Sequence, residues 1–228
     1  MKKNKKILFY DSFYPELPSL AKIKDFIPKW YKDSNSYLPG VPAFNNKGLK
    51  LCIPYLESLT VGYAFVLPCD VVVQKINGKA KFIWPKEIDF GVADRPYSTN
   101  PNLPIPNGMH KDHFAWQIKV SIKMPRGYSA LVTHPLNRND LPFITMSGIA
   151  DYDEGLAGGS LPFFLKDDFE GIIEQGTPIA QIIPFKRDEW EAKHLPGLSD
   201  ETKKETLRSQ VLTSGYYKKN RWHRKSYE

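Results

Sequence analysis

The sequence is poor in cysteine and has no long apolar run. Its 228 residues include only 2 cysteines, Cys52 and Cys69, which are too few for a disulfide framework or a closed structural zinc site. No apolar run approaches the length of a membrane span, and the apolar run after the lysine-rich start is too short for a signal peptide. We therefore expect a cytoplasmic protein with reduced thiols and no membrane partner.

Three signatures of enzymes are also missing from the sequence. It has no serine nucleophile elbow, no P-loop and no dinucleotide fingerprint, so the enzyme classes that these motifs define can be set aside. The net charge of +7 favours an anionic partner, but the positive excess lies largely in residues 1–6 and 218–225. Such ends are typical of solvated tails.

The C-terminal tail combines cations with aromatic rings, which is typical of a contact with single-stranded nucleic acid. A tail that packs on its own domain or on a neighbouring subunit is the favoured alternative. The residues concerned are Tyr216, Tyr217, Arg221, Trp222 and Arg224.

What the sequence does contain is a series of short apolar runs closed by turn residues. The 19 prolines indicate many turns and few long helices. The spacing of these runs is that of a small all-β barrel or sandwich, with strands expected at residues 128–134, 142–149, 161–166, 170–174 and 178–185. Pro184 predicts that the end of the last strand is an edge.

The rest of the chain predicts further strands and two helices. We expect strands at 7–10 and 114–124, a hairpin of 70–76 with 79–84 around Asn77-Gly78, and a long loop at 94–113. One face of a helix is predicted by the spacing of Leu20, Ile23, Phe26 and Ile27. A second helix is expected to begin at Ser199 and to end at Ser214-Gly215. The pattern of residues 51–67 fits either a helix or a strand. These elements suggest a single domain with a wrapping segment at 1–50, a β core at 51–187, and a helix and tail at 188–228.

One loop holds a cluster of metal-ligand residue types. His110 and Asp112, followed by a distal histidine, have the pattern of the facial triad of iron(II), 2-oxoglutarate-dependent oxygenases. The distal ligand would be His134 or His194. The favoured alternative is a polar, solvated loop, because short motifs of this kind are often fortuitous.

A second group consists of carboxylates on one hairpin. Asp151, Asp153 and Glu154 could hold Mg²⁺ or act on water in a phosphohydrolase, but aspartate and glycine are also what a β-turn requires, and the turn is favoured. Arg138 could grip a phosphate or carboxylate through two N–H groups, or pair with Asp140 on the surface; these two interpretations stay open.

Two resemblances accompany these patterns. The runs PYLESLTVGYAFVLPCDVVV, HPLNRNDLPF, SGIADYD and GTPIAQIIPFKRDEW resemble an uncharacterised family of about this length in marine bacteria and their phages. Over residues 60–185, the order of Gly62-Tyr63, the turn 125–127, the hairpin 147–155 and the segment 176–181 is similar to the dUTPase and dCTP deaminase superfamily. The second resemblance implies a β-clip or distorted jelly-roll core that often assembles as a trimer.

This chain also departs from that superfamily. The Ser-rich phosphate-binding segment is replaced by residues 134–138, the early motif has Ala64 instead of aspartate, and the glycine-rich C-terminal arm is absent. A shared fold does not establish a shared function. We therefore leave open whether the protein is an enzyme.

Our leading hypothesis is a divergent relative of these nucleotide-handling folds that binds a small anionic ligand such as a nucleotide. The residues expected to contact it are Arg138, Asp151, Tyr152, Asp153 and Gln181. The alternatives are a non-enzymatic structural phage or bacterial protein that forms homo-oligomers, and an iron oxygenase whose metal site includes His110, Asp112 and His134. Mg²⁺ or iron is the corresponding cofactor.

Overall fold

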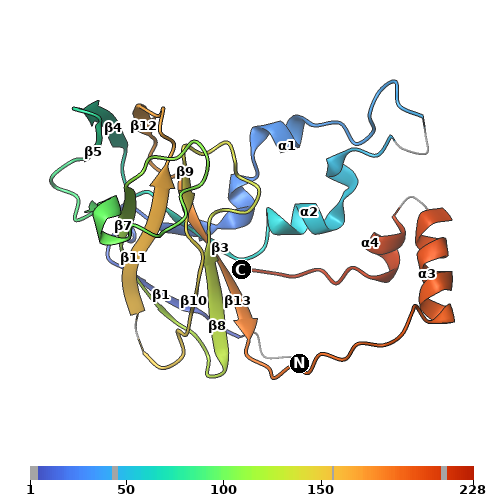
Figure 1. Cartoon of the computed structure of the whole chain (residues 1–228). Coiled ribbons are helices and arrows are strands. Elements are labelled where there is room, and N and C mark those ends of the chain that lie inside the picture. Colours follow the sequence, from blue (N-terminus) through green and yellow to red (C-terminus); the bar gives the residue numbers. More distant parts are fainter. Residues whose placement is uncertain (1–4, 43–45, 156, 212–214) are drawn as a thin grey trace. The chain divides into compact units, whose positions relative to one another are not determined.

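The computed structural model describes residues 5–42, 46–155, 157–211 and 215–228. The chain forms two compact units. The first combines Met1–Pro28 with Leu59–Arg187 and contains all the strands of the described residues, and the second combines Lys29–Ser58 with Asp188–Glu228 (Figure 1). The single domain that the sequence suggests for the whole chain stays a prediction.

The first sheet of the β unit has the order β1-β7-β11-β9, with β6 also paired to β7, and all its pairs are antiparallel. Its strands are Leu8–Asp11 (β1), Gly91–Arg95 (β6), His113–Lys123 (β7), Phe143–Thr145 (β9) and Ala157–Leu165 (β11). The strands β1 and β7 confirm the predictions at 7–10 and 114–124. The sequence of β7 alternates apolar and polar residues, as a half-buried strand does. The expected loop at 94–113 begins later than predicted, since β6 extends to Arg95 and the 3-10 turn η3 follows at Tyr97–Thr99.

The second sheet has the order β10-β8-β13-β3-β2, and a third, smaller sheet has the order β12-β4-β5. The strands are Leu20–Lys22 (β2), Tyr63–Val66 (β3), Val71–Ile76 (β4), Lys79–Ile83 (β5), Tyr128–Thr133 (β8), Gly148–Ala150 (β10), Gly171–Ile173 (β12) and Pro178–Lys186 (β13). The hairpin of β4 and β5 is confirmed: Asn77 and Gly78 have φ of 54° and 72°, as its tight turn requires. Pro184 faces β8 on one side, while the pairing of β13 with β3 ends at Ile182, so this part of β13 is an edge toward β3.

The expected strand at 142–149 is in fact two strands that belong to different sheets. β9 pairs with β11 in the first sheet, and β10 pairs with β8 in the second. Met146 and Ser147 lie between the two strands and carry the chain from one sheet to the other. The sequence has no clear break at this crossing, so it does not indicate where the chain leaves the first sheet and joins the second.

The helices are short and lie mainly in the second unit. They are η1 (Ile23–Phe26) in the β unit, and α1 (Lys29–Asp33), η2 (Leu49–Leu51), α2 (Ile53–Ser58), α3 (Asp200–Val211) and α4 (Tyr216–Asn220) in the second. The prediction of a helix from Leu20 to Ile27 is wrong. Leu20 lies in β2, and within this segment only the 3-10 turn η1 is helical. Ser199 does begin α3, because its Oγ accepts a hydrogen bond from Thr202 N at 3.1 Å, whereas Ser214 lies outside the described residues.

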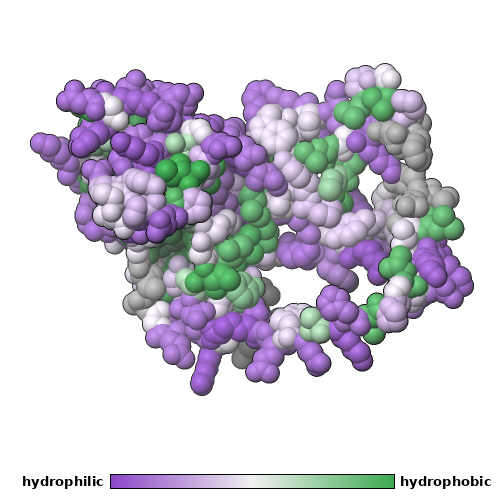
Figure 2. Space-filling view, viewed as in Figure 1, coloured by the Kyte–Doolittle hydropathy of each residue, from purple (hydrophilic) through white to green (hydrophobic). Residues whose placement is uncertain are grey.

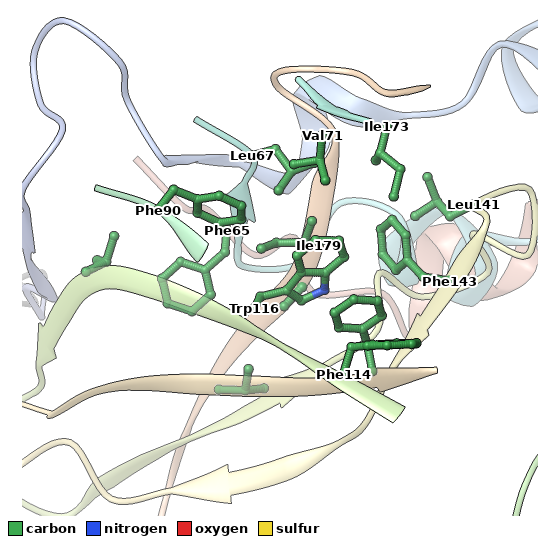
Figure 3. Packing of buried hydrophobic residues seen from close by; sticks show 14 of the residues in the cluster. Phe65, Leu67, Val71, Phe90, Phe114, Trp116, Leu141, Phe143, Ile173 and Ile179 are labelled. Atoms are coloured by element: carbon green, nitrogen blue, oxygen red, sulfur yellow. The ribbon is translucent and has the colours of Figure 1, made fainter. Parts of the chain in front are cut away.

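Aromatic rings form the centre of the β unit. Trp116 stacks on Phe163 with ring centroids 3.9 Å apart, and Phe143 packs edge-on against Trp116 at 5.3 Å. Figure 3 shows Trp116, Phe143 and Ile179 gathered in the interior between the strands. The inward positions of β7, β11 and β13 contribute to this core together with residues of β3, β4 and β8.

The prediction of a mainly β fold is confirmed, but the described strands do not close into the barrel that was one expectation. Among the described residues, no helix combines the length and the apolar composition that crossing a lipid bilayer requires.

Candidate functional site

The β unit contains an open cleft of about 480 Å³. Core residues of β3, β7 and β8 form its back wall, residues 146–150 form one side, and residues 159–162 form the other, with Tyr152 also in the lining. Its lining is mostly apolar, and its volume falls in the range typical of small-ligand sites, roughly 300–1,000 Å³.

The cleft lies where the edges of two sheets separate. β10 is the last strand of its sheet, and β9 covers the edge of β11 only from Phe163 to Leu165, so among the described residues no strand pairs with 159–161 on that side. A backbone hydrogen bond from Met146 N to Pro162 O, at 2.8 Å, joins the two sides at one end. In Figure 2, hydrophobic residues come to the surface where Figure 1 places β8 and β10.

Two glycines keep the cleft open. Gly148 is paired with Val132, and Gly159 is paired with Ile118. Because directly paired residues share a face of the sheet, both glycines occupy positions on the core side. A Cβ added at either position would meet no atom within 4 Å, and both glycines are exposed, so both positions face the open part of the cleft.

Two serines among the residues that line the cleft have hydroxyls with defined partners. Ser160 Oγ accepts a hydrogen bond from Arg95 Nη2 at 3.0 Å, and Ser147 Oγ lies 2.6 Å from Thr133 Oγ1. Ser160 is paired with Gln117, and Thr133 with Gln181, on the sheet faces opposite to Gly159 and Gly148, so these hydroxyls serve the sheets and not the cleft.

Tyr152 is held in the cleft wall by an ionic clamp on either side of it. Arg187 contacts both Asp151 and Asp153, Asp153 Oδ2 also accepts from Gly127 N at 2.7 Å, and Ser129 Oγ donates to Asp151. The hydrogen bonds from Arg187 lower the pKa of Asp153, and burial raises the pKa of Tyr152. Two aspartates of the predicted carboxylate group are therefore already engaged, and the arrangement fixes the backbone around Tyr152.

Arg138 is engaged in the same way, by its neighbour. Its Nε and Nη2 donate to Asp140 at 2.8–3.2 Å, and its Nη1 donates to Phe26 O at 3.1 Å. Its side chain is 13% exposed, and the hydrogen bond from Arg138 lowers the pKa of Asp140. The structure thus favours the second of the two interpretations left open for Arg138, pairing with Asp140, although the pair is partly buried and also ties a loop to Phe26.

Gln181 is completely buried and also serves the fold. Its Oε1 accepts from Leu136 N at 2.8 Å, and its Nε2 donates to Val61 O at 2.7 Å. Neither Gln181 nor Arg138 lines the cleft, so of the predicted ligand contacts the structure places only Tyr152 in its wall, with Asp151 and Asp153 adjacent.

The predicted metal ligands are not brought together. Within the described part of the chain, no three His, Cys, Asp or Glu side chains are grouped to hold a metal ion. His134 Nδ1 accepts from Thr145 N at 3.3 Å, so its Nε2–H is the donor to Arg138 O at 3.1 Å, and both ring nitrogens are used. His110 Nδ1 accepts from Asp112 N, and Asp112 Oδ1 accepts from Tyr97 N, which ties these two residues to loop structure.

Burial keeps two histidines of the β unit neutral. Desolvation lowers the pKa of His134, and desolvation together with the charge of Arg95 lowers the pKa of His113. His194 lies in the second unit, outside the β core.

The aromatic tail packs within its own unit. Trp222 Nε1 and Lys225 Nζ both donate to Glu57 of α2, at 2.8 Å, and Arg221 donates to Glu205 of α3 at 2.7 Å. This agrees with the expectation of a tail that packs on its own chain. Tyr217 is 44% exposed.

Comparison with known proteins gives a distant structural similarity. No family model and no curated protein matches the sequence. A mutant dUTPase of Staphylococcus bacteriophage 80alpha, solved with dUpNHpp, is 13% identical with a TM-score of 0.33, over 62% of this chain and 80% of that chain. A mutant dUTPase of phage phi11 of S. aureus, described with a structural Mg(II) ion, is 14% identical with a TM-score of 0.28, over 48% and 99%. The similarity is distant and concerns part of the chain, as the sequence predicted.

Sequence reasoning missed the cleft itself and the residues Gly148 and Gly159. A glycine inside a strand is a known signal of a bulge or of close approach by another group. Gly148 lies within the strand that the sequence predicts at 142–149, and Gly159 lies outside the predicted strands, so neither glycine indicated a cleft.

Proposed function

We propose that the cleft between β10 and β11 binds a small ligand with a flat, largely apolar body and an anionic group, for which a deoxynucleotide is the favoured example. The observation that carries this proposal is the pair of core-facing glycines, Gly148 and Gly159. They leave an open, mostly apolar space between two strand edges.

The two strand edges also favour a planar heterocycle. Backbone N–H and C=O groups at the free edges of β10 and β11 need hydrogen-bond partners, and a base offers both donors and acceptors in one plane. The apolar back wall would contact the faces of such a ring.

Replacing Gly159 by valine tests the proposal. The added side chain should fit without a steric clash, because the first carbon meets nothing within 4 Å and the backbone of Gly159 is not left-handed. It should nevertheless occupy the cleft. Gly155→Val is the matched control, because Gly155 has the same free space and does not line the cleft.

The measurement is calorimetric titration and thermal shift with a panel of deoxynucleoside mono- and triphosphates. A ligand that binds the native state must raise its melting temperature. We expect binding by the natural protein and by Gly155→Val, and an affinity at least about tenfold weaker in Gly159→Val, which corresponds to about 1.4 kcal/mol. Equal affinity in all three proteins would place the ligand elsewhere, and no binding by any panel member would reject the nucleotide.

An interaction protein is the second candidate, supported by an exposed apolar row on the small sheet. Ile172 of β12, Val72 of β4 and Ile83 of β5 are directly paired and share one face, and the two isoleucines are 57% and 48% exposed. Light scattering of the natural protein and of an Ile172→Lys, Ile83→Lys variant tests this. A larger natural particle that the variant reduces would support self-association through this row, and identical masses would exclude it.

A further inference from the structure

The charge excess of the protein lies in the last two helices and in the tail that follows them. Residues 203–225, which we call the basic segment, contain eight lysines and arginines and a single carboxylate, that of Glu205, so their net charge is +7. The net charge of the whole chain is also +7, and the remaining residues together are therefore neutral. The segment includes most of α3 and all of α4, which lie against each other in the second unit (Figure 1).

The carboxylates that contact the basic segment hold it in place. Glu205 of α3 accepts hydrogen bonds from Tyr216 Oη and, at 2.7 Å, from Arg221 Nη2, and these bonds lower the pKa of Glu205. Glu57 of α2 accepts from Trp222 Nε1 at 2.8 Å. These contacts fix α4 and the start of the tail against α2 and α3, so a partner would meet a preformed surface and would not have to order it.

Half of the cations in the segment are paired and half are free. The paired ones contact Asp200, Glu205 or Glu57. Among the described residues, the side chains of the other four make no hydrogen bond or ion pair, and all four are exposed. These four free cations are Lys204, Lys218, Lys219 and Arg224. Like charges at this density attract an anionic polymer, whose binding also releases the counterions that the polymer carries.

Tyr217 places an aromatic ring beside the free cations. It is 44% exposed, and its backbone carbonyl accepts hydrogen bonds from two later N–H groups at 2.9 Å, which holds the residue in α4. In a helix, Tyr217 and Lys218 follow Tyr216 by about 100° and 200° around the axis. Because Tyr216 faces α3, its two neighbours point elsewhere. An exposed ring next to cations is the combination on which an unpaired base stacks.

We propose that the basic segment binds single-stranded nucleic acid, with the four free cations on the phosphates and Tyr217 stacked on a base. An unpaired base can offer its face to Tyr217, whereas the bases of a duplex stack on one another. A membrane surface is disfavoured, because Leu207 and Val211 are the only apolar residues of α3 and are too few for a face that inserts. The inference concerns the second unit and is independent of the cleft in the β unit.

The test measures fluorescence anisotropy of labelled oligonucleotides. The probes are oligothymidylate and oligouridylate of about 20 nucleotides and a duplex of the same length, and vesicles of phosphatidylserine and phosphatidylcholine are used in sedimentation. The proteins are the natural chain, the double variant Lys218→Gln, Lys219→Gln, and Tyr217→Ala, with Tyr217→Phe as the variant that keeps the ring. The double variant Lys79→Gln, Lys81→Gln on β5 is the matched control, because it removes the same charge from two exposed lysines.

We expect the natural protein to bind both single strands more tightly than the duplex. The logarithm of its affinity should fall with the logarithm of the salt concentration with a slope of roughly −3, as four phosphate contacts predict. Lys218→Gln, Lys219→Gln should make this slope shallower by about 1.4, and the control should keep it. Tyr217→Ala should weaken binding by about five- to a hundredfold with the slope unchanged, and Tyr217→Phe should bind like the natural protein.

The charge variants and the ring variants can each overturn the inference. Equal affinities and slopes in Lys218→Gln, Lys219→Gln and its control would show that the free cations are not the site. Equal affinity of Tyr217→Ala and the natural protein, or equal binding of duplex and single strands, would reject stacking on an unpaired base. If Tyr217→Ala does not fold, as judged by circular dichroism and melting temperature, the charge variants and the duplex decide.

Two further outcomes concern the kind of partner. Binding to the vesicles and to no oligonucleotide would assign the segment to a membrane surface, and absence of binding to every probe would reject the inference as well. Gly159→Val should bind the oligonucleotides as the natural protein does, because the cleft belongs to the other unit. Failure of this inference would therefore leave the proposed function of the cleft unchanged.

Discussion

Replacing Gln181 by methionine should destabilise the β unit without affecting the cleft. The substitution conserves length and shape but removes both ends of the amide. Leu136 N loses its acceptor and Val61 O loses its donor, and the two groups belong to loops that Gln181 joins to β13.

The expected cost follows from these two backbone groups. A buried polar group without a partner costs about 1–3 kcal/mol, so two would cost about 2–6 kcal/mol. Both bonds are only part-buried, and water that reaches the freed groups reduces the loss to about 2–4 kcal/mol. For a protein of this size that corresponds to a decrease in melting temperature of roughly 4–16 °C.

Urea denaturation measures this change through the midpoint, with the slope expected to stay constant. Gln74→Met on β4 is the control, because Gln74 is exposed and should change the free energy of unfolding by less than about 0.5 kcal/mol. If Gln181→Met changed stability no more than Gln74→Met, the two hydrogen bonds would not contribute and the reasoning would fail.

A glutamate at position 181 sharpens the test. Its carboxylate can accept from Leu136 N but repels Val61 O, and burial without a cation raises its pKa. A group whose folded pKa is raised in this way destabilises most at high pH, and the penalty decreases as the pH falls and the carboxyl becomes protonated. Gln181→Glu should therefore approach the natural stability in acid.

Two further predictions concern ion pairs in the two units. The hydrogen bond from Arg138 lowers the pKa of Asp140. The pair therefore stabilises the protein above the unfolded pKa of about 3.9, and this contribution is lost as the pH falls through the lower folded value, which gives an acid limb in the plot of stability against pH. Asp140→Asn should lower stability at neutral pH and flatten this acid limb in pH-dependent urea denaturation. An unchanged acid limb would argue against the pair. In the second unit, Glu57→Ala should free Trp222 and Lys225, so that trypsin cleaves the tail several-fold faster than in the control Glu189→Ala. Glu189 is an exposed residue and serves as the control for that reason. Equal cleavage rates would show that Glu57 does not hold the tail.

Much of the strand pattern could be predicted because it is local. The hairpin at Asn77-Gly78 depends on two residues that accept positive φ, and β7 shows the alternation that one buried face imposes. Neither feature requires knowledge of the rest of the chain. The N-cap of α3 at Ser199 is local in the same sense.

The errors occurred where the environment decides. Residues 142–149 were expected to form one strand, but the change from one sheet to the other at Met146 and Ser147 depends on strands far away in sequence. Leu20 has the spacing of a helix face, yet it forms β2 because β3 offers an edge for pairing. Pairing with a distant strand overrides a weak local preference.

The candidate site shows the same limit for side-chain roles. Arg95, Arg138 and Arg187 have the same chemistry in the sequence, and each could bind an anion. What distinguishes them is whether the fold places aspartates against the guanidinium, as it does for Arg138 and Arg187 and does not, among the described residues, for Arg95. Among the described residues, Arg95 instead contacts Ser160 on the face of β11 opposite to Gly159. The partner of each arginine is therefore a property of the fold, and because Arg138 is engaged by Asp140, the cleft, rather than the segment around Arg138, is the place to look for a ligand.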